Sequence, residues 1–166
     1  MKKIVFSLIA LTLFTSCKER VTKKFLISEI PMVAEAPLFD GPNTLQAQFL
    51  FDPKTIDPAL SYDDIKHVTI SRAEITASDS SGFDHIRNVV LQFTSANAAM
   101  QKAGVLNPVP KGVRNISINP SAETELTEHF KQSEITIVLD ADLEGDREEA
   151  LTMSGSFEFE IKYNSK

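Results

Sequence analysis

A two-residue alternation near the carboxyl end constrains the fold of this chain more than any other feature. From residue 151 to residue 163, odd positions are apolar or glycine and even positions are polar or charged. Successive side chains of a β-strand point to opposite faces, so the pattern predicts a long strand with one buried face. Residues 135–143 alternate in the same way, except at Val138. Because Gly145 and Asp146 between the two segments are typical of a turn, we expect an antiparallel hairpin.

Shorter alternating segments predict further strands. They lie at 25–30, 45–51, 68–77, 89–93 and 116–118. A change of parity at Ser71 and Arg72 predicts a β-bulge or a break. One short helix is expected after Pro120, because Leu126 and Phe130 lie four residues apart and would share a face. About seven strands with frequent turns and one short helix are typical of an all-β antiparallel β-sandwich, either Ig-like or jelly-roll-like.

The amino-terminal residues have the form of a bacterial lipoprotein signal peptide. Two lysines precede a mainly apolar run over residues 4–14, and two small residues separate that run from Cys17, the only cysteine. The run is shorter than the about 20 residues that span a bilayer. Cleavage before Cys17 would free its sulfur for a diacylglyceryl group, and two or more acyl chains give a stable anchor. We therefore expect a signal peptide (1–16), a lipidated tether (17–24) and one sandwich domain (25–166). The alternative is an ordinary signal peptide that contains a cysteine.

Charge narrows the range of partners. Residues 1–16 hold two of the 17 basic residues and none of the 23 acidic residues, so the mature chain would carry a net charge of −8. That balance argues against nucleic-acid binding, which needs a basic footprint, and disfavours electrostatic docking on anionic lipid. Lys18 stands where an Asp retains some lipoproteins in the inner membrane, which favours the outer membrane. The sequence leaves the leaflet open, periplasmic or surface.

An acidic segment before the last strand is a candidate calcium loop. Asp140, Asp142, Glu144 and Asp146 place oxygen ligands at alternate positions, as in the first half of an EF-hand loop. Residue 151, where the bidentate glutamate would stand, is Leu. The alternative is that the aspartates form the wet face of a strand. We therefore expect no cofactor, with Ca²⁺ as the alternative.

No sequence motif for catalysis is present, so we expect a noncatalytic protein. The chain lacks the Gly-x-Ser-x-Gly elbow, the Ser-x-x-Lys motif, the glycine-rich phosphate loops and the His-Glu-x-x-His zinc motif. Residues 98–110 are expected to form a loop. That loop either offers Met100, Val105 and Leu106 to a partner or caps the open end of the sandwich.

The order of the segments resembles that of small exported lipoproteins of the Bacteroidota, a group without an established activity. The similar parts are 65–77, 83–93, the helix with Leu126 and Phe130, and 135–163. The resemblance implies a β-sandwich and no catalytic residues. We expect a lipid-anchored envelope protein with a binding, assembly or accessory structural role, whose partners are the membrane and an envelope protein. The alternatives are a calcium-stabilised sandwich that binds glycan or lipid and, third, a hydrolase.

Overall fold

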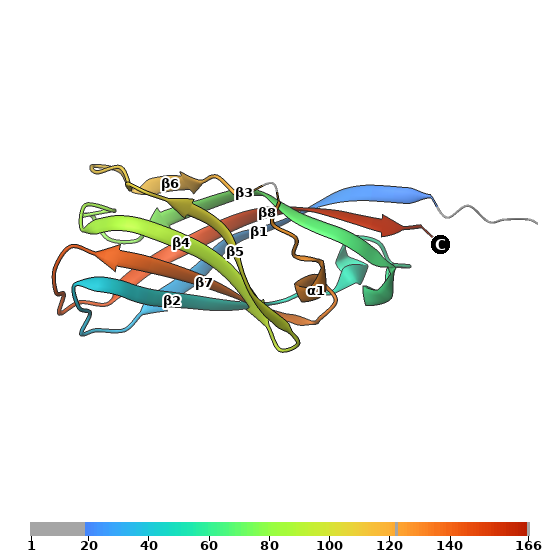
Figure 1. Ribbon diagram of the computed structural model, residues 1–166, viewed down its shortest axis with the longest axis horizontal. Helices are drawn as coiled ribbons and strands as arrows, with labels where there is room; N and C mark the ends of the chain where they lie inside the picture. Colours follow the sequence, from blue (N-terminus) through green and yellow to red (C-terminus); the bar gives the residue numbers. More distant parts are fainter. Residues whose placement is uncertain (1–18, 122, 166) are drawn as a thin grey trace, which may run out of the picture.

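Eight antiparallel strands and one short helix make up the fold of the computed structural model, which describes residues 19–121 and 123–165 (Figure 1). The strands are β1 (Arg20–Ala34), β2 (Gly41–Leu50), β3 (Ile65–Ala77), β4 (Ile86–Ser95), β5 (Ala98–Leu106), β6 (Asn115–Ile118), β7 (Glu134–Leu143) and β8 (Leu151–Asn164). The helix is α1 (Thr127–Phe130), and two 3-10 turns are Pro53–Thr55 and Tyr62–Asp64. In the described ranges no helix is long and apolar enough to cross a membrane.

The strand order is that of a jelly roll. The order is β5-β4-β7-β2-β1-β8-β3-β6, and β1 meets β2 only at the pair Val33–Gln46. The sheet is therefore two four-stranded layers, β2-β7-β4-β5 and β1-β8-β3-β6. Strand β1 pairs with β8, β2 with β7, β3 with β6 and β4 with β5, as in a chain folded in half between β4 and β5 and then rolled up. This order confirms the all-β antiparallel sandwich and selects its jelly-roll form, with eight strands instead of about seven.

The prediction that the last two strands form a hairpin is wrong. Both strands are present, but β7 pairs with β2 and β4, whereas β8 pairs with β1 and β3. The connection 144–150 passes from one layer to the other instead of turning back within a layer. In the strand order, β2 and β1 lie between β7 and β8. The alternation of apolar and polar residues determines which face of a strand is buried, but it does not determine which strand is its neighbour.

Two segments expected outside the sheet belong to it. Residues 20–24, expected in the tether, pair with the end of β8 from Arg20–Asn164 onward. Residues 98–106, expected in a loop, form the edge strand β5. The layers approach closely here, because a Cβ on Gly104 would lie 2.7 Å from Cγ2 of Ile118, and a bridge joins Gly104 to Pro120.

The core lies between the layers and follows the predicted alternation. The odd positions of β8 are buried, and its even positions are partly exposed, except Lys162, which is exposed. The register of β3 against β8 shifts between Ile70 and Arg72, which confirms a bulge at the parity change. Leu126 and Phe130 are fully buried, and the Phe130 ring lies 4.8 Å from the ring of Phe159 between centroids. Phe130 at the end of the helix and Leu126 just before it therefore pack into the core.

The antiparallel order gives the molecule two different ends (Figure 1). All four connections from an odd to an even strand lie at one end, here called the loop end: 35–40, 78–85, 107–114 and 144–150. The other end, here called the terminal end, holds the start of β1, the end of β8 and the loop 51–64. There the amide of Ser165 donates to the carbonyl of Glu19 at 2.9 Å. At about 3.3 Å per residue, the 15 residues of β1 separate the two ends by roughly 50 Å.

Candidate functional site

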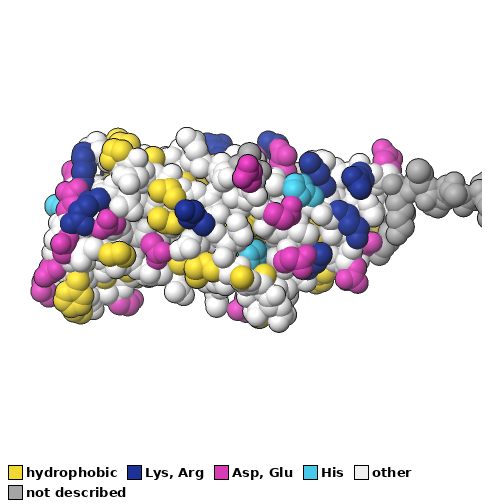
Figure 2. All heavy atoms as spheres, in the orientation of Figure 1, with side chains coloured by type: hydrophobic (Ala, Val, Ile, Leu, Met, Phe, Trp, Pro, Cys, Tyr) yellow, Lys and Arg dark blue, Asp and Glu magenta, His cyan; other side chains and the backbone are white. Residues whose placement is uncertain are grey.

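An acidic cleft of about 600 Å³ lies at the loop end between the β3–β4 and β7–β8 connections. Its lining residues are Asp79, Ser80, Ser81, His85, Glu144, Asp146, Arg147, Glu148 and Glu149. Five of these nine side chains are carboxylates and only one is an arginine. Figure 2 shows acidic side chains gathered at this end of the molecule. The cleft therefore presents a negative potential to solvent.

A partly buried ion pair forms one wall of the cleft. Arg147 exchanges two backbone hydrogen bonds with Leu38, both 2.9 Å long, and its Nη2 lies 3.3 Å from Oδ2 of Asp79. The other oxygen of Asp79 accepts from Oγ of Ser81 at 2.6 Å and from the amide of Gly82 at 2.9 Å. Burial works to raise the pKa of Asp79, but these hydrogen bonds and the charge of Arg147 hold it below its usual value. Arg147 is thus already neutralised by Asp79.

Glu148 and Glu149 add two unneutralised charges to the cleft. Both are exposed, and no hydrogen bond or ion pair reaches either carboxylate from any described residue. Two adjacent free carboxylates beside a cleft suit an ammonium or guanidinium group, since charge-assisted hydrogen bonds to carboxylates are the stronger kind.

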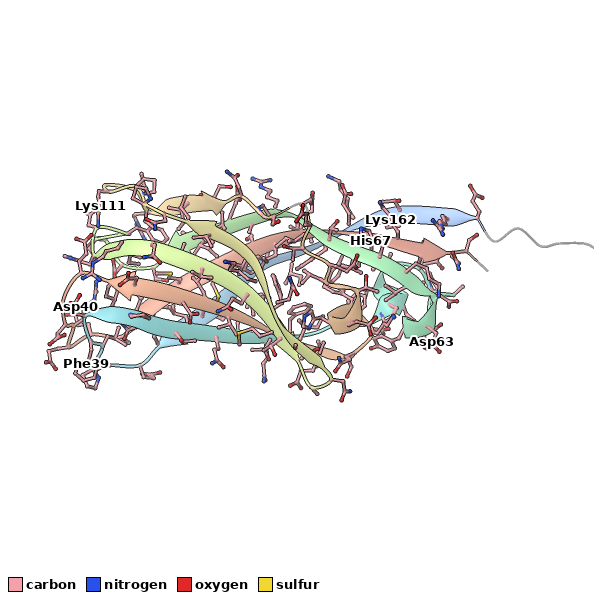
Figure 3. The ribbon with its side chains drawn as sticks, in the orientation of Figure 1. Phe39, Asp40, Asp63, His67, Lys111 and Lys162 are labelled. Atoms are coloured by element: carbon pink, nitrogen blue, oxygen red, sulfur yellow. The ribbon has the colours of Figure 1, made fainter. Side chains whose placement is uncertain are left out.

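A network of side chains ties the other loops to this site. Arg87 on β4 pairs with Asp40 and with Asp142, and Oδ1 of Asp40 also accepts from the amide of Gly145 at 3.1 Å. The Gly145 amide and then the Arg87 guanidinium lower the pKa of Asp40. Nζ of Lys111 lies 2.7 Å from Oε1 of Glu144. Figure 3 shows Asp40 and Lys111 at the same end, with Phe39, whose ring is exposed, on the side of Asp40 away from Lys111.

The structure gives the two candidate calcium ligands on β7 separate polar partners. Asp140 accepts from Oγ1 of Thr44 at 2.6 Å and from Nε2 of Gln92 at 2.7 Å. Asp142 accepts from Nη1 of Arg87 at 2.6 Å and from Nδ2 of Asn88 at 2.8 Å. Each oxygen of both aspartates is therefore engaged on the outer surface of the β2-β7-β4 layer.

The other two candidate calcium ligands line the cleft but do not complete a metal cluster. Glu144 pairs with Lys111, and Oδ1 of Asp146 accepts from the amide of Asp40 at 2.8 Å. Within residues 19–121 and 123–165, no group of three or more His, Cys, Asp or Glu side chains is placed to hold a metal ion. The four carboxylates proposed from the sequence are thus divided among separate environments.

The three apolar residues proposed for partner binding lie on β5. Met100 and Val105 are exposed, whereas Leu106 is partly buried against the core. They are part of a sheet edge, so the expectation of an exposed loop or cap is wrong. Cys17, the proposed lipidation site, lies outside the described residues.

A Ser–His pair at the terminal end could not be found from the sequence. Nδ1 of His129 lies 2.9 Å from Oγ of Ser95, which accepts a hydrogen bond from Nε2 of Gln132 at 3.0 Å. The direction of the hydrogen bond between Ser95 and His129 depends on which ring nitrogen of His129 carries the proton. Burial lowers the pKa of His129, with Glu128 acting in the opposite direction. Because 34 residues separate the pair, no local pattern could have indicated it.

The pair has the residue types of a hydrolase nucleophile and base. Catalytic serine–histidine pairs need a third group to orient the histidine. No carboxylate among the described residues hydrogen-bonds to the ring of His129. Gln132 instead binds Ser95 and the amide of Asn97, at 3.1 Å, so the cluster fastens α1 to the β4–β5 turn.

Comparisons with known proteins give distant structural likenesses only. No protein-family model matches the chain, and no curated protein matches it. A structure of Cocksfoot mottle virus has a TM-score of 0.33 and 7% identity, covering 100% of this chain and 98% of that chain. A structure of Mud crab tombus-like virus has a TM-score of 0.29 and 9% identity, covering 89% and 91% respectively. These TM-scores are too low to establish a shared fold.

Proposed function

We propose that this chain is a lipid-anchored protein of the bacterial outer membrane with a noncatalytic binding role. The observation that carries the proposal is the position of the acidic cleft at the opposite end from Arg20, which lies three residues after Cys17. An anchor at Cys17 would leave the loop end directed away from the lipid. Loops clustered at one end of a β-sandwich are a common position for binding residues.

The chemistry of the cleft favours a cationic ligand. We propose a lysine- or arginine-rich segment of an envelope protein, because Glu148 and Glu149 are free to pair and the volume suits a few side chains. The hydrogen bonds and ion pairs between the loops would hold these carboxylates in place before binding, which reduces the entropy lost when a ligand binds. Binding of this kind weakens as ionic strength rises.

The anchor is tested by metabolic labelling with a palmitate analogue followed by membrane fractionation. We expect wild-type protein to carry the label and sediment with the outer membrane. The variant Cys17→Ala should carry no label and should not enter the outer-membrane fraction. Wild-type protein that is unlabelled and released as a free protein would contradict the proposal.

The cleft is tested by calorimetric titration of the detergent-solubilised, lipidated protein with a tetra-arginine peptide. The double variant Glu148→Gln/Glu149→Gln should bind about tenfold more weakly, since two exposed ion pairs contribute up to about 1 kcal/mol each. The matched control is Glu123→Gln/Glu134→Gln, which removes two exposed carboxylates outside the cleft. An equal loss in both double variants would show that only net charge matters and would contradict a role for the cleft.

A further inference from the structure

Very little chain separates Cys17 from the folded domain. Strand β1 begins at Arg20, so only two residues lie between it and the cysteine. Three residue steps span at most about 11 Å whatever their conformation. If Cys17 carries the lipid, as proposed above, the start of β1 stays within about that distance of the headgroups.

The part of the sheet nearest to Cys17 is a strand tip, made of residues 20–24 of β1 and 160–164 of β8. The two segments pair residue by residue from Arg20–Asn164 to Lys24–Glu160. The tip carries four basic side chains and one carboxylate, and the basic residues are Arg20, Lys23, Lys24 and Lys162. Lys24 pairs with Glu158 on the same face.

Three of these basic residues remain available to a ligand. Arg20, Lys23 and Lys162 are exposed, and none has a carboxylate of a described residue within salt-bridge distance. Lys162 lies beside His67 in the sheet, at the end where both are labelled in Figure 3. Figure 2 shows basic side chains, together with acidic ones, at the terminal end of the molecule. The charge of this tip is opposite to that of the cleft at the other end.

We infer that the strand tip is a membrane-contact surface and that the domain stands on it, with Arg20, Lys23 and Lys162 against anionic phosphate headgroups. The short link holds the tip at the bilayer. Basic residues are attracted to the anionic surface, and an orientation that brought the acidic loop end to that surface would be repelled. Acidic groups farther from the tip than a Debye length of about 8 Å are screened. The opposing charge is therefore that of the nearby carboxylates, such as Glu160 and Asp57, which accepts from the hydroxyl of Tyr163 at 3.2 Å. The cleft then projects roughly 50 Å from the membrane.

The inference is tested by energy transfer on the intact lipidated protein in vesicles. Thr22→Cys on the tip and Ser80→Cys in the cleft each introduce one free thiol, because Cys17 is acylated. A donor on each thiol is measured against acceptor-labelled lipid in phosphatidylethanolamine vesicles with and without phosphatidylglycerol. We expect strong transfer from position 22 and weak transfer from position 80. Strong transfer from both positions would mean that the domain lies flat, and would overturn the inference.

Charge dependence and anchoring are separated by one further variant. Arg20→Gln/Lys23→Gln/Lys162→Gln should still float with the vesicles through its acyl chains. In the wild type we expect phosphatidylglycerol to increase the energy transfer from position 22, and this triple variant should lose that increase. An unchanged melting temperature of the variant is the control for an intact fold. A response to phosphatidylglycerol equal to that of the wild type would overturn the headgroup contact. Failure of the wild type to float would instead contradict the lipid anchor.

Discussion

A single buried histidine gives the stability of this protein a defined pH dependence. Burial lowers the pKa of His129 in the folded state, whereas in the unfolded chain it is about 6.5. As the pH falls below about 6.5, the unfolded state binds a proton first, so folding stability decreases until the pH passes the folded pKa. The slope approaches about 1.4 kcal/mol per pH unit.

The measurement is urea unfolding between pH 7 and pH 5 for the wild type and for His129→Asn. Asparagine places an amide group near the position of Nδ1 and does not titrate, so the stability of the variant should change less over this range. The pKa values of Asp40 and Asp79 are lowered in the folded state, so these residues reduce the folding stability only below about pH 4. Both proteins contain these two residues. Parallel curves for the two proteins would rule out this role of His129.

Gly82 positions the loop that supplies Asp79 to the cleft. Its φ of 59° lies in the left-handed region, and a Cβ there would stand 2.2 Å from the carbonyl oxygen of Val113. Gly112 also has a positive φ, 73°, but no atom lies within 4 Å of the position of its Cβ. Substitution of Gly112 therefore measures the cost of backbone strain alone, without a steric clash. Gly112→Ala should cost about 1 kcal/mol and Gly82→Ala about 3 kcal/mol or more in urea unfolding. Equal losses would show that the β3–β4 loop moves away freely.

At the scale of elements, the sequence identified strands better than it identified their neighbours. Residues 135–143 and 151–163 form strands with the predicted faces, because alternation reflects burial directly. Their pairing depends on how the whole double strand is rolled, which a local pattern does not contain. Residues 20–24 and 98–106 were missed because they contain few large apolar side chains. Their partners β8 and β4 provide the regular pattern.

Of the residues that line the cleft, the sequence predicted only those that lie within one short segment. Glu144 and Asp146 were selected for their alternate spacing, and both line the cleft. Asp79 and His85 come from another loop about 60 residues away, so their proximity follows from the fold alone. The spacing of Asp140 and Asp142 reflects the wet face of β7, where Thr44 and Arg87 on the flanking strands bind them.

These strand-to-strand contacts lead to a prediction about calcium. Because Asp140 and Asp142 already accept two hydrogen bonds each, a calcium ion would have to displace Gln92 or Arg87. We expect millimolar CaCl₂ to change the melting temperature of the wild type by less than 1 °C, whereas a bound ligand at 100 times its Kd would add about 2.7 kcal/mol. Mg²⁺ at equal concentration is the control for ionic strength. A calcium-specific rise of several degrees that is lost in Asp142→Ala would instead support the calcium-stabilised sandwich.

At the scale of the whole molecule, the rolled double strand places the longest ladder between the two ends of the chain. Residues of β1 pair with residues of β8 that lie more than 110 positions later. Such long-range pairing slows folding, because loop closure precedes the contacts that stabilise it. A circular permutant removes this separation, since the amide of Ser165 and the carbonyl of Glu19 already lie 2.9 Å apart. A short Gly/Ser linker would join residues 165 and 19, and the chain would open between Ala96 and Asn97, at the bend of the double strand.

The permutant should fold faster than the unlipidated Cys17→Ala protein, with a similar free energy of unfolding. Its β1–β8 ladder becomes a local hairpin, and only the tight β4–β5 hairpin loses its connection. Stopped-flow refolding followed by circular dichroism measures the rate, and binding of the tetra-arginine peptide reports on the cleft, which lies at the end opposite the cut. A permutant that folds more slowly, or that folds without a functional cleft, would show that the β4–β5 bend and not the outer ladder organises the roll. Faster folding with the cleft intact would instead mean that β1 and β8 are the framework on which the inner strands assemble.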